Sequence, residues 1–362
     1  MSVFTGYFCG TGSTRLDVDN TNYWSGELVS TLAANDLCPE FTYAVAMDGP
    51  GSGNLQDDEL FVEPGRYSAV MGTLFGRGWN QNVAHAMQVI KGRSSWQRDE
   101  LSKVEYNRLK AAGVPIPDAA HKFLGQRNFG QRKVTSQALR EQIIAMSRPA
   151  RLPTRVNLVG WSRGGISCHM LANAMAADPE LKHIPVNIFA LDPVPGIGNM
   201  QSCRITLERN VQEYVGFYSR DERSKGFAPV IPKTAPSTVM YIYPIPGRHA
   251  TLVGNASRDG KSSGQVLAEP GLIVRHTAET FLTRWGTKLA NRLNLSDRQL
   301  MTYQKLMQLE DNLYQAMSKQ SYTVLREGIK GERSVHYGAS TKPFSELLDD
   351  RLPLGMPWNR RG

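Results

Sequence analysis

The sequence RVNLVGWSRGGISCHMLA, residues 155–172, predicts a buried strand, a sharp turn and a helix in direct succession. Residues 155–159 are mostly apolar, which is typical of a strand covered on both faces of a sheet. The turn contains the pattern G-x-S-x-G, whose glycines make room for a serine held in a strained backbone conformation. This context predicts that Ser162 is a nucleophile at the N-terminus of a helix, where the helix dipole favours negative charge.

A serine hydroxyl is a poor nucleophile until a base removes its proton, and an acid must orient that base. In enzymes built around this turn, the acid and then the base follow the serine along the chain. His249 lies in the loop directly after the predicted strand Val239–Ile245, where its side chain can fold back over the sheet, whereas His276 begins a predicted helix. We therefore predict that His249 is the base. Lone histidines elsewhere, such as His169, are expected to be ordinary surface or core residues.

Two aspartates, Asp192 and Asp221, could be the acid, and the residues alone do not decide between them. Asp192 ends the predicted strand Val186–Asp192, and the prolines that follow it at 193 and 195 would fix its position, which favours it. Asp221 follows the predicted strand Val211–Tyr218 and reaches the same edge of the sheet. Its D-E-R context is more typical of a solvated ion-pair turn.

Backbone N–H groups beside the serine could stabilise the negative charge that develops on a carbonyl oxygen during acyl transfer. The N–H of Arg163, directly after the nucleophile, is one candidate, and those of Gly10 and Thr11, in the loop after the first predicted strand, are the others. This loop lacks the Lys-Ser/Thr ending of a P-loop and the full dinucleotide spacing, so no nucleotide or other cofactor is expected. The carboxylates near Asp17 lack EF-hand spacing, so no metal site is predicted.

Short apolar runs alternate with helical patterns along most of the chain. The predicted strands are Val3–Cys9, Phe41–Met47, Arg155–Gly160, Val186–Asp192, Val211–Tyr218 and Val239–Ile245. The predicted helices between them are Gln81–Ile90, Ser136–Met146 and Gly165–Ala176. This alternation predicts an α/β fold with a mostly parallel sheet and helices on both faces.

Two regions depart from this pattern. Residues 92–134 are polar and charged, which indicates an insertion or cap. After Pro270 the strands stop, and two amphipathic helices are predicted at 272–293 and 297–325, with Ser296 as the N-cap of the second. We therefore predict a catalytic domain over residues 1–269 and a helical C-terminal subdomain and tail over residues 270–362.

The chain has 362 residues, of which 41% are hydrophobic and 21% charged, which excludes disordered, collagen-like and disulfide-stapled proteins. Its net charge of +9 is unevenly distributed. The first 90 residues contain three arginines and ten carboxylates, a net charge of −7, so the other 272 carry +16. Such a basic surface could meet nucleic acid, anionic phospholipid or an acidic partner, and composition does not choose among them.

The four cysteines form no CxxC pair, which indicates free thiols in a protein made in the cytosol. The N-terminus has no basic stretch followed by an apolar one, so no Sec signal is predicted. No apolar run approaches the ~20 residues of a membrane span. We expect synthesis in the cytoplasm, with any export by a leaderless route.

Five separated motifs occur in an order typical of one family. They are the Gly-Thr-Gly loop at 10–12, GWSRGG at 160–165, DPV at 192–194, DER at 221–223 and PGRH at 246–249. With them, residues 1–255 resemble the α/β-hydrolase domain of type VI secretion phospholipase effectors and their bacterial and fungal relatives, which typically show GFSRGA, DTV, DERR and FPGxH. The family's first loop usually reads FDGT, and here Cys9 stands where that aspartate would be.

The resemblance implies a serine esterase or lipase acting on phospholipid, with Ser162, Asp192 and His249 as nucleophile, acid and base. The implied partners are a lipid or ester substrate, an anionic membrane surface, and an immunity or secretion-apparatus protein, and no nucleic acid is expected. The alternative hypothesis is a membrane- or partner-binding protein, in which the basic C-terminal region binds and the hydrolase core is vestigial.

Overall fold

The structure is a computed structural model of the chain. It describes residues 2–38, 42–50, 79–92, 103–111, 118–121, 127–128, 151–196, 198–256, 267–319 and 331–347. The predicted helix Ser136–Met146, most of the predicted insertion or cap at 92–134, and the tail after residue 347 lie outside these described residues.

The largest element is a six-stranded sheet in which every neighbouring pair of strands is parallel. Its spatial order is β2-β1-β5-β6-β7-β9. The strands are β1 (Val3–Phe8), β2 (Ala44–Met47), β5 (Arg155–Trp161), β6 (Val186–Leu191), β7 (Val211–Ser219) and β9 (Val239–Ile245). The predicted α/β fold with a mostly parallel sheet is confirmed.

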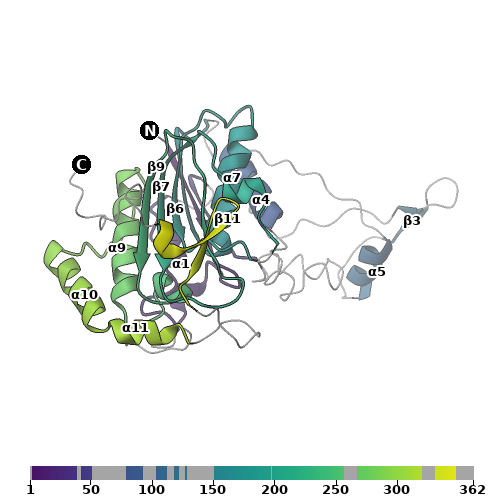
Figure 1. Cartoon of the computed structure of the whole chain (residues 1–362). Helices are drawn as coiled ribbons and strands as arrows, with labels where there is room; N and C mark the ends of the chain where they lie inside the picture. Colours follow the sequence, from purple (N-terminus) through teal and green to yellow (C-terminus); the bar gives the residue numbers. More distant parts are fainter. Residues whose placement is uncertain are drawn as a thin grey trace.

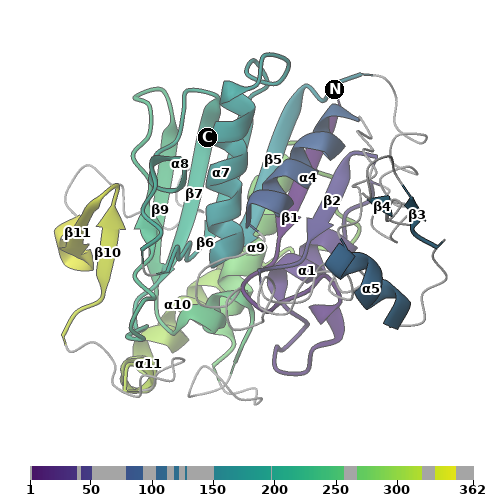
Figure 2. The same cartoon turned by 90° about the vertical axis from the view of Figure 1, so that its right-hand side faces the viewer.

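Helices cover both faces of this sheet (Figure 1, Figure 2). On one face lie α4 (Trp79–Lys91) and α7 (Arg163–Ala177), and on the other lie α1 (Leu28–Ala34) and α9 (Glu269–Arg284). Each face has its own cluster of buried apolar side chains, which explains why the central strands are apolar along almost their whole length.

The helical C-terminal region is divided differently from the prediction. The predicted helix 272–293 ends at Arg284 as α9, and the predicted helix 297–325 is two helices, α10 (Asp297–Leu309) and α11 (Asp311–Met317). The N-cap of α10 is Ser296, as predicted, and its side chain accepts a hydrogen bond from the N–H of Gln299.

The expectation that strands stop after Pro270 is wrong. β10 (Ser334–Tyr337) pairs in parallel with β8 (Val230–Ile231) and antiparallel with β11 (Ser340–Pro343), forming a second sheet. Each of the two new strands has only four residues, and every residue of β11 is exposed. No alternation of apolar residues therefore marks them in the sequence.

The remaining elements are short. They are α5 (Lys103–Ala111), α8 (Ser202–Ile205), β3 (Ala120–His121), β4 (Arg127–Asn128), and the 3-10 turns η1 (Asp17–Asp19), η3 (His249–Val253) and η4 (Phe344–Leu347). Among the helices in the described part of the chain, none has the length and apolar character needed to cross a membrane.

Candidate active site

Ser162 occupies the turn between β5 and α7, in a backbone conformation that is rare for a residue with a side chain. Its φ is 57° and its ψ is −123°. Such a conformation is strained and persists only where the surroundings enforce it. Here the N–H of Ser162 donates to the carbonyl of Leu191 at 2.9 Å, and its own carbonyl accepts from the N–H of Val194 at 3.2 Å. The end of β5 is thus tied to the end of β6.

The two flanking glycines leave no space for a side chain. A Cβ atom on Gly160 would lie 2.4 Å from the backbone of Gly164, and one on Gly164 would lie 2.0 Å from the carbonyl oxygen of Phe8. The turn therefore packs backbone against backbone, and glycine is required for that reason.

Asp192 and His249 form a buried hydrogen-bonded pair beside this turn. Asp192 directly follows β6 and has a φ of 45°, and its Oδ2 lies 2.6 Å from Nδ1 of His249. The imidazole lies between two aromatic rings, those of Trp161 and Phe227, each with its centroid 5.1 Å away. Because Trp161 directly precedes Ser162, the fold brings Ser162, Asp192 and His249 to one place at the carboxyl ends of β5, β6 and β9.

The other aspartate, Asp221, makes different contacts. Its side chain is buried, contrary to the expected solvated turn, and its Oδ2 accepts from the N–H of Gly247 at 2.8 Å. Arg220 also donates to it, at 3.1 Å. Asp221 therefore holds the loop that leads to His249, whereas Asp192 contacts the His249 ring itself.

The neighbouring Glu222 is buried too, in an ion pair with the fully buried Arg248. Burial would raise the pKa of Glu222, but the charge of Arg248 and a hydrogen bond from Ser224 lower it. The N–H of His249 donates to the same carboxylate at 3.3 Å. Asp221 and Glu222 therefore both accept hydrogen bonds from the backbone of the loop that contains His249. The ion pair with Arg248 permits the burial of the Glu222 carboxylate.

Arg333, which the sequence analysis did not single out, completes the surroundings of Asp192. Its Nη1 donates to Oδ1 and its Nη2 to Oδ2 of Asp192, both at 2.7 Å. Burial alone would raise the pKa of Asp192, but the charge of Arg333 and the hydrogen bond with His249 outweigh it and lower the pKa to about 2. Asp192 is therefore an ionised carboxylate.

The three residues predicted to supply oxyanion contacts also lie together. A Cβ atom on Gly10 would lie 2.3 Å from the Trp161 ring, so the loop after β1 packs against the residue before Ser162. Thr11 Oγ1 accepts a hydrogen bond from Nη1 of Arg163 at 2.9 Å. Burial raises the pKa of the Cys9 thiol well above its usual value, so this residue remains a neutral thiol in the same loop.

Two other histidines lie away from this place. His169 is buried in α7, where its Nδ1 and Nε2 contact the carbonyl of Arg204 and the hydroxyl of Tyr214. His276 accepts a hydrogen bond from the N–H of Leu295. Within the described ranges, no group of three or more His, Cys, Asp or Glu side chains is arranged to hold a metal ion.

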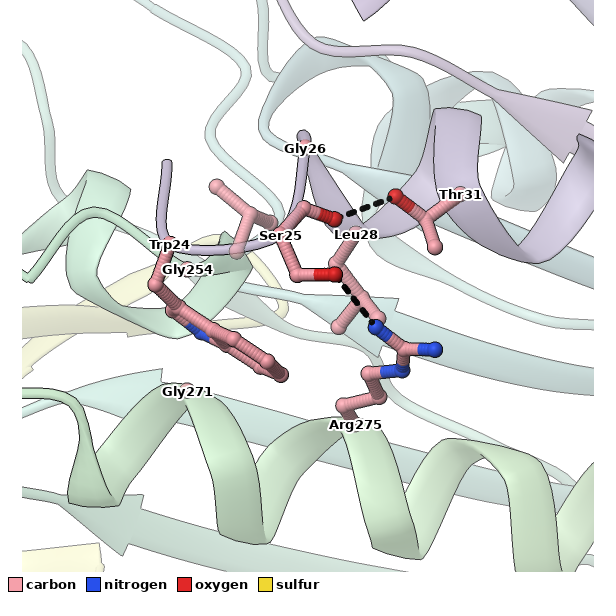
Figure 3. A pocket seen from close by; sticks show the side chains of 9 residues that line it. Trp24, Ser25, Gly26, Leu28, Thr31, Gly254, Gly271 and Arg275 are labelled. Atoms are coloured by element: carbon pink, nitrogen blue, oxygen red, sulfur yellow. Dashed lines mark hydrogen bonds between the residues drawn. The ribbon is translucent and has the colours of Figure 1, made fainter. Parts of the chain in front are cut away.

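A small pocket lies on the α9 side of the molecule, next to the end of η3 (Figure 3). Its lining includes Trp24, Gly254 and Gly271, and the Arg275 side chain crosses it to donate to Ser25 Oγ at 3.2 Å. The indole N–H of Trp24 is buried there, without a hydrogen-bond partner among the described residues. The pocket borders the turn that begins at His249 but does not include the His249 ring.

No family model matches the chain, and no curated protein matches it. Two solved structures are similar to this chain at 13% sequence identity. One is an uncharacterised protein from Pseudomonas aeruginosa, with a TM-score of 0.46, and the match covers 87% of this chain and 52% of that one. The other is a Tle1 effector bound to the VgrG spike of the type 6 secretion system, with a TM-score of 0.36, and the match covers 70% of this chain and 51% of that one. The chain spans about half the length of either neighbour.

Proposed function

We propose that this protein is a serine hydrolase of carboxylic esters, with Ser162 as nucleophile, His249 as base and Asp192 as acid. The observation that supports it best is the strained Ser162, at a strand-to-helix turn, beside the buried Asp192–His249 pair with its 2.6 Å contact.

The proposed reaction follows from the state of this pair. Because Asp192 is ionised, it can only accept a hydrogen bond, so Nδ1 of His249 carries a proton, and in the neutral ring Nε2 then has a free lone pair. Nε2 takes the Ser162 proton as Oγ attacks the ester carbonyl, and the N–H groups of Gly10, Thr11 and Arg163 stabilise the oxyanion. The alcohol leaves with the proton, and water then releases the acyl group from Ser162.

Phospholipid is the proposed substrate. This part of the proposal rests on the motif resemblance and on the +16 charge of residues 91–362, which suits anionic headgroups. Membership of the type VI effector family, export by that system, and an immunity or secretion-apparatus partner are proposed on the same resemblance. We also propose a catalytic domain at 1–269 and a helical C-terminal subdomain at 270–362.

Labelling with a fluorophosphonate probe tests whether Ser162 is the nucleophile. Assays on short-chain esters and on a panel of phospholipids then test the substrate. We expect the wild type and Ser318→Ala, a control at the end of α11, to be labelled and active, and Ser162→Ala to be neither. Labelling of Ser162→Ala at the wild-type rate would refute the assignment. Activity on short esters but on no phospholipid would refute only the substrate.

A further inference from the structure

The C-terminal segment of the chain contributes a buried cation to the candidate active site. We propose that Arg333 is a positioning residue for hydrolysis, whose guanidinium fixes both oxygens of Asp192 so that Oδ2 meets Nδ1 of His249. The inference rests on the proposed function, since it assigns a role in the same reaction.

The contacts of Arg333 leave its guanidinium no freedom to rotate. Nη1 donates to Asp192 Oδ1 and to Ser219 Oγ, both at 2.7 Å, and also contacts the Ser219 carbonyl. Nη2 donates to Asp192 Oδ2 at 2.7 Å and to the Phe227 carbonyl at 2.9 Å. Arg333 is only 4% exposed. A planar fork held on both Nη atoms imposes one orientation on the carboxylate that it binds.

The backbone around Arg333 is held in place on both sides. Before it, the carbonyl of Gly331 accepts a hydrogen bond from Nε of Arg223 at 2.8 Å. After it, Val335 is fully buried in the apolar cluster on the α7 side of the sheet. The carbonyl of Arg333 itself accepts from the N–H of Phe344 at 2.9 Å. The guanidinium is therefore in position before substrate arrives, which a positioning role requires.

Two other cations described near this pair, Arg248 and Arg223, bind groups other than Asp192. Glu222 pairs with Arg248, and Arg223 bonds the carbonyls of Arg220 and Glu222. Arg333 is thus the cation bound directly to Asp192, whose carboxylate is completely buried. Without Arg333, the buried Asp192 carboxylate would have fewer hydrogen-bond partners. A buried carboxylate in this situation moves toward other partners or takes up a proton.

The charge of Arg333 also keeps Asp192 ionised, because it opposes the rise in pKa that burial of this carboxyl would cause. Replacing Arg333 with methionine should therefore make Asp192 easier to protonate. A protonated Asp192 is no longer a charged partner for the His249 ring, so the acidic limb of the kcat/KM profile should move to higher pH.

The experiment compares Arg333→Met, Arg333→Lys and the control Thr341→Ala, which removes a hydrogen bond in the same β10–β11 hairpin. In Arg333→Met, kcat should fall roughly ten- to a hundredfold, as expected for a reacting group misplaced by about 1 Å, with KM almost unchanged. Arg333→Lys keeps the charge but not the fork, so kcat should fall while the acidic limb stays in place. Thr341→Ala should match the wild type in both.

A readout independent of turnover is the proton NMR signal of the His249 Nδ1–H, identified by its loss in His249→Gln. It should shift or broaden in Arg333→Met and not in Thr341→Ala. A folded Arg333→Met with the wild-type pH profile and the wild-type signal would overturn the inference and leave the proposed function intact. If Arg333→Met does not fold, wild-type kcat in Arg333→Lys overturns it instead. Full activity in Ser162→Ala would overturn both proposals together.

Discussion

Glu27 is a completely buried carboxylate whose replacement should change how stability depends on pH. It is the N-cap of α1, and it accepts hydrogen bonds from the N–H groups of Val29 and Ser30 at 3.0 and 2.9 Å and from the Ser30 hydroxyl at 2.8 Å. Burial raises the pKa of Glu27 to about 7, although these hydrogen bonds act against the rise and nearby Asp17 adds to it.

The size and sign of the effect follow from linkage. An unfolded glutamate has a pKa of about 4.3, so between that value and about 7 the folded protein holds a proton that the unfolded chain releases. The stabilisation is fully present below about pH 4.3 and is lost as the pH rises through 7. The gap in pKa corresponds to about 4 kcal/mol in total, of which about 3 kcal/mol is lost between pH 4 and pH 8. Glu27→Gln keeps an acceptor oxygen for the helix N-terminus but does not titrate.

Urea denaturation followed by tryptophan fluorescence, repeated from about pH 4 to pH 8, measures the effect. The free energy of unfolding of the wild type should fall by about 3 kcal/mol relative to that of Glu27→Gln across this range. Glu208→Gln, at an exposed position, is the matched control and should follow the wild type. A constant difference between wild type and Glu27→Gln at every pH would refute the reasoning.

Three further predictions follow from the site and its surroundings. Asp192→Asn should lower kcat by roughly 10³- to 10⁴-fold, because the amide no longer fixes the tautomer of His249. Asp221→Asn should lower kcat by much less, because Asp221 binds the backbone of the loop and not the His249 ring. Equal small losses of kcat in steady-state assays would exclude both residues as the acid. Gly164→Ala should prevent folding or abolish activity, since its Cβ would lie 2.0 Å from the Phe8 carbonyl oxygen; a wild-type melting temperature and rate would contradict this. Burial lowers the pKa of His169 to about 4. In the same urea titrations, the free energy of unfolding of the wild type should therefore fall by about 3 kcal/mol relative to that of His169→Gln as the pH falls from about 6.5 to 4. Parallel pH dependences of the two proteins would contradict this prediction.

The parts of the site that depend on local structure could be predicted from the sequence. The position of Ser162 could be predicted because one continuous stretch encodes the strand, the turn and the helix that surround it. The closeness of Asp192 and His249 could be predicted because parallel strands place the residues that follow them at a common edge of the sheet. The six strands themselves were evident because burial on both faces makes them continuously apolar.

The parts that depend on distant pairing could not be predicted. Arg333 lies 141 residues from Asp192, and an arginine among polar residues carries no sign of its partner. The burial of Glu222 was missed for a related reason, because it depends on Arg248, a cation 26 positions along the chain. Charged residues read one at a time indicate exposure, and only the fold reveals that opposite charges permit their burial.

The long separation between Asp192 and Arg333 has a consequence for the newly made chain. Ribosomes deliver the N-terminal part first, and the six strands of the main sheet can pair before Arg333 has emerged. During that interval the Asp192 carboxylate has no guanidinium partner, and burying it in its ionised form would cost several kcal/mol. In the nascent protein the Asp192 carboxylate must therefore stay hydrated or carry a proton. Pairing of β10 with β8 is then the folding step that brings Arg333 to Asp192 and completes the surroundings of this carboxylate.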